Sequence, residues 1–498
     1  MVRVPRRYVA AVAATAAVAL AAACTSTGVD AQTSAVRDTS NGTLKAACTS
    51  STCSGTRSGG AFVIQLPDKS NWNGTLLLWS HGYRAAAPVP SNPLNPTALT
   101  PVDRSAQDAP NTDVAKALLT QGYALAGSAA GSNGWDTLDG VRAAEDLYSY
   151  FNTTFGTPNR VYLWGQSLGG LTTEMLAETH QSWVSGVAPM CGPIAGTNRN
   201  FDLALDVAYA VKTLVAPKLQ LTGFSSVNQA VDQWNYATNA LIKAAQKADL
   251  ADLFAIAAIA GVPAPPRTDM FDGSKLDSQV QAVVQSIVQA VQTNTYIRYD
   301  LEQRVGGNPS QNTGVDYAAR IGNNFQALIP AQQLHKITDK LAAGTRVSAD
   351  PAARAKANTL GNPDGSIQRP TITLHTEADS VDIVQNENVF GNQVAAHSDG
   401  GQLIQLYTGP PNTYSSAPYG AGNCNFTNLE FEGVVQMLDN WARYAVYAGP
   451  GSAGQAFDYT VDSTDASKNN PKKIAAGTAT TGYDPNFAAP PWPASATG

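Results

Sequence analysis

One short segment of the chain combines residue types that could perform nucleophilic chemistry. Residues 161–170 read VYLWGQSLGG, an apolar run typical of a strand, then Gly-x-Ser-x-Gly, then a helix-forming stretch. A tight turn between strand and helix excludes side chains beside the serine, so Gly165 and Gly169 would leave Ser167 at its tip. The following helix would direct free N–H groups at the same place. The spacing predicts a nucleophile elbow.

A second motif could supply hydrogen-bond donors to the reaction. The residues SHGYR follow the predicted strand Leu76–Trp79, so that His81 and Gly82 form a His-Gly step. Such a step after an early strand usually frames an oxyanion hole, in which the N–H of Tyr83 would join the N–H of Leu168. Two donors suit the charge that develops on an ester carbonyl oxygen.

A carboxylate follows a later predicted strand, Thr371–Leu374. Asp379 lies a few residues beyond this strand and is the best-placed candidate for the acid of a catalytic triad, with Glu377 and Asp382 as fallbacks. The same position is compatible with a purely structural role, in which Asp379 caps the start of a helix.

These motifs lie in a chain where short apolar runs alternate with helical stretches. The alternation favours a mainly parallel sheet covered by helices on both faces, with ligands at the carboxyl ends of the strands. The predicted strands are Ala61–Leu66, Leu76–Trp79, Tyr123–Ala126, Val161–Trp164, Val184–Pro189, Thr371–Leu374 and Leu403–Tyr407. The predicted helices are Thr112–Gln121, Leu138–Phe155, Leu168–His180, Val381–Ala396 and Leu429–Ala445.

The alternation stops near Thr197 and returns near residue 370, so an α/β core would comprise residues 60–196 and 370–448. Residues 197–369 are helical and loop-rich, and we interpret them as a cap over the active site; the alternative is a separate helical domain of unrelated function. Residues 449–498 are polar and rich in Pro and Gly, and we expect them to be irregular. A helical stripe in the insertion comprises Val280, Val283, Val284, Ile287, Val288 and Val291.

The composition bounds the class of protein. The 498 residues carry a net charge of −6, and only 14% are charged, below the usual ~25%. This fits a protein outside the cytoplasm. The sequence contains no basic stripe, so nucleic acid is not expected as a partner.

Residues 1–24 have the features of an export signal. Three arginines precede the apolar stretch Tyr8–Ala23, which ends at Cys24. This pattern is typical of a secretory signal peptide, and the stretch is short for a membrane span of ~20 apolar residues. Because AAAC resembles a bacterial lipobox, we expect lipidation of Cys24 and a tether to the outer face of the membrane; the alternative is free secretion after cleavage near Ala31. Residues 25–59, rich in Ser, Thr and Gly, would form the tether.

The cysteine count also indicates export. Apart from Cys24 there are four cysteines, an even number that suits an oxidising compartment. Cys48 and Cys53 are close enough to close a small loop, which leaves Cys191 and Cys424 to pair by elimination. The spacing of Cys and His suggests no zinc site, and no metal or organic cofactor is implied.

The loop after the predicted strand Leu403–Tyr407 reads GNCNFT at residues 422–427. With this motif the chain resembles the secreted serine esterases and peptidases of the α/β-hydrolase superfamily. It resembles in particular a bacterial set with Ser-His-Gly-Tyr, Gly-x-Ser-x-Gly-Gly, Leu-His-Thr-x-x-Asp and Gly-His-Cys-Asn-Phe-Thr. The resemblance covers about residues 60–195 and 370–445 and implies an α/β-hydrolase fold.

The resemblance also implies roles for individual residues. Ser167 corresponds to the nucleophile and Asp379 to the acid, whereas the histidine of the last motif falls on Asn423. In related esterases a cysteine beside the catalytic histidine is tied by a disulfide. Cys424 has that position, and Cys191 is a reasonable partner.

Asparagine at this position changes the expected chemistry. A triad histidine takes the proton of the serine and returns it to the leaving group, but an amide can only form hydrogen bonds. Two hypotheses follow. The protein is an exported serine hydrolase that acts on a small-molecule carboxylic ester or a peptide, with impaired or rerouted proton transfer; alternatively, it is a catalytically silent fold kept as a binding protein.

Another of the five histidines could replace the missing base. His81 and His375 both lie at carboxyl ends of predicted strands. His180 would end the helix after the serine, His335 lies in the insertion, and His397 falls at the opposite end of the sheet. His81, His375 or a residue of the cap are therefore the candidates.

Overall fold

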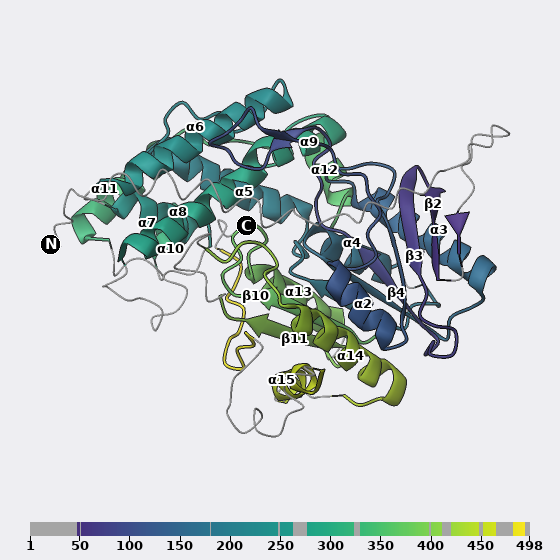
Figure 1. Cartoon of the computed structure of the whole chain (residues 1–498). Coiled ribbons are helices and arrows are strands. Elements are labelled where there is room, and N and C mark those ends of the chain that lie inside the picture. Colours follow the sequence, from purple (N-terminus) through teal and green to yellow (C-terminus); the bar gives the residue numbers. More distant parts are fainter. Residues whose placement is uncertain are drawn as a thin grey trace, which may run out of the picture.

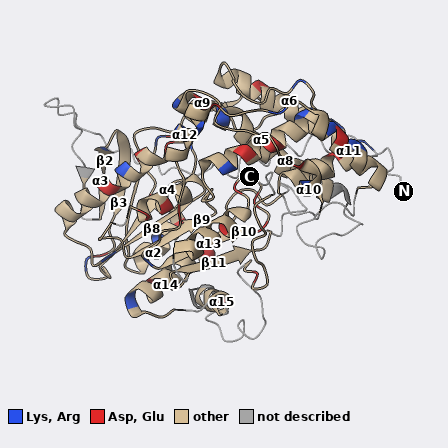
Figure 2. Ribbon diagram, turned by 180° about the vertical axis from the view of Figure 1, so that it is seen from behind, with Lys and Arg blue, Asp and Glu red and all other residues tan. Residues whose placement is uncertain are grey.

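The computed structural model describes ten stretches of the chain: residues 47–49, 51–179, 181–247, 250–261, 276–322, 329–397, 400–410, 420–447, 452–464 and 482–493. The predicted signal peptide, Cys24 and His180 lie outside these residues. Within them, no helix is both long and apolar enough to cross a membrane. Figure 2 shows Lys and Arg interspersed with Asp and Glu over the sheet and over the helical insertion.

The described part of the chain contains a nine-stranded sheet in the order β1-β2-β3-β7-β4-β8-β9-β10-β11. From β7 to β11 neighbouring strands are parallel, whereas β3 is antiparallel to both β2 and β7. The strands are β1 (Ala47–Cys48), β2 (Thr52–Arg57), β3 (Gly60–Gln65), β4 (Thr75–Ser80), β7 (Ala124–Ser128), β8 (Arg160–Gln166), β9 (Gly186–Met190), β10 (Thr371–Thr376) and β11 (Leu403–Thr408). A short pair, β5 (Val89–Pro90) and β6 (Leu99–Thr100), lies apart.

Helices cover both faces of this sheet (Figure 1). On one face Leu77 and Trp79 of β4 pack with α2 (Thr112–Thr120) and α14 (Asn428–Tyr444). On the other face Leu76 and Leu78 pack with α3 (Thr137–Phe155) and α4 (Leu168–Ala177). Successive side chains of a strand point to opposite faces, so the continuous apolar run of β4 is buried on both. A further helix, α13 (Gln385–His397), connects β10 to β11.

The strand order and connections define the fold. Eight strands, from β2 to β11 without the short pair, form a mainly parallel sheet whose second strand is antiparallel. Helices flank this sheet, and the Gly-x-Ser-x-Gly turn joins the fifth strand, β8, to α4. This is the α/β-hydrolase fold, and the predicted fold class is confirmed.

A large helical segment separates β9 from β10 and lies to one side of the sheet in Figure 1. Trp234, Ile256 and Ile287 belong to its own apolar core, and the predicted valine and isoleucine stripe of residues 280–291 is buried there. The segment comprises α5 (Thr197–Leu214), α6 (Val227–Ala245), α7 (Ala251–Ile259), α8 (Leu276–Gln292), the π-helix η4 (Thr293–Ile297), α9 (Arg298–Val305), α10 (Tyr317–Ile321), α11 (Ala331–Ala343) and α12 (Pro351–Thr359).

Two terminal segments differ from the sequence-based expectation. The end of the expected tether, residues 25–59, contains β1 and β2, because pairing with β3 and burial of Cys53 hold a polar strand at the sheet edge. The expected irregular tail, residues 449–498, contains the helix α15 (Ala453–Thr464), whose Phe457 is buried in the core beside α14. Composition was misleading in both places because packing against the sheet and α14 overrides a polar local sequence.

Candidate active site

Ser167 lies in the turn between β8 and α4, with φ 54° and ψ −130°. A non-glycine residue rarely adopts a positive φ, and such strain persists only where the surroundings impose it. The surroundings are two close backbone approaches. A Cβ added to Gly169 would lie 2.0 Å from the carbonyl oxygen of Ser80, and one added to Gly165 would lie 2.7 Å from the same oxygen. The two glycines therefore let the turn approach β4, which holds the serine at its tip.

The loop after β4 lies against this serine. A Cβ added to Gly82 would be 3.4 Å from the Cβ of Ser167. In the described part of the chain, the N–H groups of Tyr83 and of Leu168, the first residue of α4, have no hydrogen-bonded acceptor. Two unpaired amides near the tip of the elbow suit the stabilisation of an oxyanion.

His81 is turned to its own loop. Its Nδ1 donates to the carbonyl oxygen of Gly82 at 2.7 Å. Burial, together with the charge of Arg84, lowers the pKa of His81 to about 4. The ring is therefore neutral at pH 7, and its described hydrogen bonds shape the loop rather than engage Ser167.

Asp379 occupies the loop after β10 and is almost fully buried. Its carboxylate accepts three backbone N–H groups, from Val381 at 2.9 Å, Asp382 at 3.0 Å and Cys424 at 2.8 Å. The side-chain amide of Asn423 also donates to it, at 3.1 Å. Burial raises the pKa of Asp379, whereas the backbone donors favour its charged form.

The hydroxyl of Ser167 contacts a second carboxylate, that of Asp382. Ser167 Oγ donates to Asp382 Oδ2 at 2.9 Å, and Asn423 Nδ2 donates to the same oxygen at 3.0 Å. Asp382 is 5% exposed. Burial, and to a smaller extent the negative charge of Asp379, raises the pKa of Asp382 to about 7.

The sequence indicates Asp382 only as a fallback for the acid and does not indicate its contact with the serine. The available signal was the combination of an absent histidine with two aspartates three residues apart after β10. The contact itself arises from the loop. The turn in which the Asp379 side chain accepts the N–H of Asp382 returns residue 382 to the serine side.

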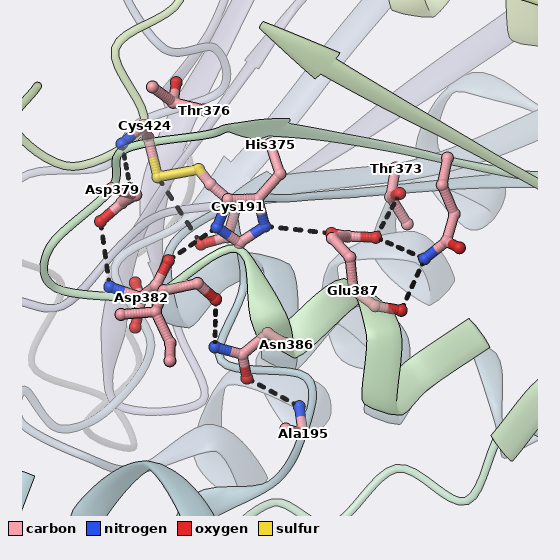
Figure 3. Close-up of polar contacts among 12 residues, drawn as sticks. Cys191, Ala195, Thr373, His375, Thr376, Asp379, Asp382, Asn386, Glu387 and Cys424 are labelled. Carbon is pink, nitrogen blue, oxygen red and sulfur yellow. Dashed lines mark hydrogen bonds and ion pairs between the residues drawn. A yellow bond between two sulfur atoms is a disulfide. The ribbon is translucent and has the colours of Figure 1, made fainter. Parts of the chain in front are cut away.

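His375, near the end of β10, is directed at Asp382 and Glu387 (Figure 3). Its Nε2 donates to the carbonyl oxygen of Asp382 at 2.6 Å, and its Nδ1 faces Glu387 Oε1 at 3.1 Å. Burial lowers the pKa of His375, but the hydrogen bond and the charge of Glu387 outweigh burial and raise it. Both ring nitrogens face acceptors, so the ring is held as an imidazolium and is not positioned to take a proton from Ser167.

Both predicted disulfides are present. Cys48 pairs with Cys53 at the sheet edge. Cys191, directly after β9, pairs with Cys424, and their Cα atoms are 5.5 Å apart. The second disulfide ties the loop that carries Asn423 to the strand next to the elbow, which fixes the amide between the two carboxylates.

The helical segment reaches the same loops. Ser380 Oγ donates to Gln289 Oε1 of α8 at 2.7 Å, and Ala282 of α8 packs with Ala378 and Ala421. On the other side of the site, Tyr83 packs against the apolar core of the helical segment. The segment thus contacts the loops that bear Tyr83, Asp379 and Asn423.

In the residues that the structure describes, no group of three or more His, Cys, Asp or Glu side chains is arranged to hold a metal ion. The chemistry that these residues can perform themselves is acyl transfer. The hydroxyl of Ser167, whose backbone is strained, is hydrogen-bonded to a carboxylate, and the N–H groups of Tyr83 and Leu168 lie nearby without an acceptor in the described part of the chain.

Comparison with known proteins gives matches only among solved structures. No family model and no curated protein matches the sequence. The chain is similar to the rice cell wall degrading esterase LipA from Xanthomonas oryzae, with 15% identity over 74% of this chain and 81% of that chain and a TM-score of 0.30. It is also similar to feruloyl esterase B from Aspergillus oryzae, with 13% identity, 79% and 82% coverage and a TM-score of 0.36. The proline iminopeptidase of Mycobacterium smegmatis matches with 12% identity, 79% and 100% coverage and a TM-score of 0.34. The fold assignment rests on the strand order and connections, not on these similarities.

Proposed function

We propose that the protein is an exported serine hydrolase that cleaves carboxylic esters, with Ser167 as its nucleophile. The observation that carries the proposal is the strained conformation of Ser167 together with its 2.9 Å hydrogen bond to a buried carboxylate. A structural serine has no need of a positive φ and two flanking close approaches, whereas a nucleophile at the tip of a tight turn uses both, together with an acceptor for its proton.

The surrounding residues suit the steps of acyl transfer. The N–H groups of Leu168 and Tyr83 would stabilise the oxyanion that forms when Ser167 attacks an ester carbonyl. Asp379, which accepts the backbone N–H of Asp382, and Asn423, which donates to its carboxylate, would hold Asp382 in place beside the serine. Esters are favoured over amides because an alkoxide leaving group is a weaker base than an amine anion and therefore depends less on a strong proton donor.

The helical insertion is proposed as a cap. Its α8 packs on the loops of Asp379 and Asn423, and its apolar core receives Tyr83, so it would exclude water from the acyl site. The α/β core of residues 60–196 and 370–448 would carry the chemistry beneath this cap at residues 197–369.

The test is covalent labelling with a fluorophosphonate, together with hydrolysis of a p-nitrophenyl ester. We expect labelling of the wild-type protein, no labelling of Ser167→Ala, and unchanged labelling of Ser149→Ala, a matched change of an exposed serine on α3. A p-nitroanilide in the same assay would reveal peptidase activity, which uses the same constellation.

The competing function is a catalytically silent fold that binds a ligand, and Asn423 is the observation that favours it. The variant Asn423→His separates the two functions. If this variant is labelled strongly while the wild-type protein is not labelled at any pH, the natural chain is a binding protein and the hydrolase proposal is wrong.

Export is part of the proposal and is supported by the two disulfides, which suit an oxidising compartment. Lipidation of Cys24 would tether the protein to the outer face of the membrane. Cell fractionation tests this: the wild-type protein should sediment with membranes and Cys24→Ser should not. Recovery of both proteins in the medium would support free secretion instead.

A further inference from the structure

The site raises the question of which group accepts the proton of Ser167. Asn423, at the position of the expected histidine, offers an amide, which has no basic form near neutral pH. His375 uses both ring nitrogens elsewhere, and His81 is turned to Gly82. The acceptor that the serine hydroxyl contacts is Oδ2 of Asp382.

We propose that Asp382 is the general base of this hydrolase, a carboxylate that takes the proton of Ser167 and returns it to the leaving group. The inference rests on the proposed function and assigns the proton transfer that Asn423 cannot perform.

Asp382 is held from three sides. Its N–H donates to Asp379 at 3.0 Å, and its carbonyl oxygen accepts the Nε2–H of His375 at 2.6 Å, so its peptide units are fixed at both ends. Figure 3 shows both contacts, from Asp379 and from His375 to the backbone of Asp382. Its side-chain oxygen is oriented by the amide of Asn423 at 3.0 Å. The carboxylate is thus preorganised toward the hydroxyl of Ser167.

The two buried carboxylates, Asp379 and Asp382, differ in how readily each takes up a proton. Asp379 accepts three backbone amides and is thereby favoured as the charged member. Asp382 accepts only the hydroxyl of Ser167 and the amide of Asn423 among the described hydrogen bonds. Because two like charges this close cannot both ionise freely, a proton taken up by the pair goes to Asp382.

The titratable groups that act on Asp382 set its working range. Burial and the negative charge of Asp379 raise the pKa of Asp382 to about 7, while the imidazolium of His375 opposes this rise. The hydroxyl of Ser167 in the elbow and the amide of Asn423 in the loop before α14 also donate to Asp382, and both hydrogen bonds oppose the rise of its pKa. A base with a pKa near the operating pH transfers protons most efficiently in both directions.

The reaction balances with these groups alone. The proton of Ser167 moves to Oδ2 of Asp382 while the oxygen lone pair forms a bond to the ester carbonyl carbon. The π electrons move onto the carbonyl oxygen beside the N–H groups of Leu168 and Tyr83. When these electrons return to the carbon–oxygen double bond, the bond between the carbonyl carbon and the alcohol oxygen of the ester breaks, and that oxygen takes the proton from Asp382. Water then attacks the acyl carbonyl carbon and gives a proton to Asp382. When the bond to Ser167 Oγ breaks, that oxygen takes the proton back, which releases the carboxylic acid and regenerates Ser167 and the carboxylate.

The experiment measures the rate of fluorophosphonate labelling of the full chain between pH 5 and pH 9. For the wild-type protein we expect the rate to rise with pH through a midpoint near 7, because only the ionised carboxylate accepts a proton. Asp382→Asn should lower the plateau rate by about 10²- to 10⁴-fold, the usual worth of general-base catalysis, and remove the midpoint.

Asp108→Asn is the matched control. Asp108 is another buried aspartate, and burial raises its pKa to about 6, but it hydrogen-bonds Gln65 rather than Ser167. Its replacement should leave the labelling profile unchanged. Equal labelling of the wild-type protein and Asp382→Asn would overturn the inference while leaving the serine hydrolase intact.

A second variant keeps the inference testable if Asp382→Asn does not fold. His375→Gln keeps a donor for the carbonyl of Asp382 but removes the positive charge, so the midpoint should move upward by roughly half a pH unit or more. A midpoint that stays in place contradicts the assignment. Absence of labelling in the wild-type protein at every pH, together with strong labelling of Asn423→His, would instead overturn the proposed function itself.

Discussion

A buried carboxylate that stays charged for catalysis should reduce the stability of the protein, and Asp382→Asn tests this cost. Asp382 is 5% exposed and its pKa is raised to about 7 in the folded chain, whereas an aspartate in an unfolded chain has a pKa of about 4. The folded state therefore holds this proton more tightly than the unfolded state. The stability that the protonated group contributes is complete below pH 4 and is lost as the pH rises through 7.

The size of the effect follows from these two values. Between pH 4 and pH 7 the folded state retains a proton that the unfolded state has released, and each pH unit corresponds to 1.36 kcal/mol. The wild-type protein should therefore lose about 4 kcal/mol of unfolding free energy from this group across that window. Asparagine carries no charge at any pH, so Asp382→Asn avoids the loss. Weaker hydrogen bonding to Ser167 offsets about 1 kcal/mol of the gain.

The assay is urea denaturation with both disulfides intact, followed by tryptophan fluorescence at pH 4.5 and pH 8. We expect the variant to match the wild-type protein at pH 4.5 within about 1 kcal/mol and to exceed it by about 3 kcal/mol at pH 8. Asp108→Asn provides a comparison, because a pKa of about 6 gives a smaller gain over a lower pH window and no loss of labelling. A variant that is less stable at pH 8, or whose difference does not change with pH, would refute the reasoning.

The remaining predictions concern the elbow, the disulfide and the insertion. Gly169→Ala should prevent the elbow from forming as observed, because its Cβ would lie 2.0 Å from the carbonyl oxygen of Ser80; we expect a lower melting temperature and loss of labelling. Replacing Cys191 and Cys424 together by Ala opens a link across 233 residues and should lower the free energy of unfolding in urea by roughly 2–5 kcal/mol. Arg298→Met removes a fully buried guanidinium that has four hydrogen-bond partners and lies 3.8 Å from the carboxylate of Glu302 in the helical insertion; it should cost about 3–5 kcal/mol, seen as faster proteolysis of that segment.

The sequence was most informative where the chemistry is local. The elbow at residues 165–169 depends on five consecutive residues, and the alternation of strands and helices depends on short windows, so both could be predicted. The pairing of Cys191 with Cys424 followed by elimination among four cysteines. The edge strand β2 and the helix α15 could not be predicted, because each owes its order to a partner that is distant in the sequence.

The role of Asp382 was beyond the sequence for a different reason. The residue types around it are ordinary, and its position at Ser167 results from a turn closed by Asp379 and from the hydrogen bond of His375, seven residues earlier in the chain. Local propensity says nothing about which of two neighbouring aspartates faces a serine 215 residues away. That choice is made by the tertiary arrangement of three loops.

Asparagine at position 423 is consistent with this arrangement rather than a defect in it. One amide group donates to Asp379 and to Asp382 at once, at 3.1 and 3.0 Å, and so separates two carboxylates with a neutral donor. A histidine in its place would present an acceptor nitrogen to Ser167, where it would compete with Oδ2 of Asp382 for the same proton. Asn423 and Asp382 therefore replace a single histidine together. The amide of Asn423 orients the carboxylates of Asp379 and Asp382, and the carboxylate of Asp382 accepts the proton of Ser167.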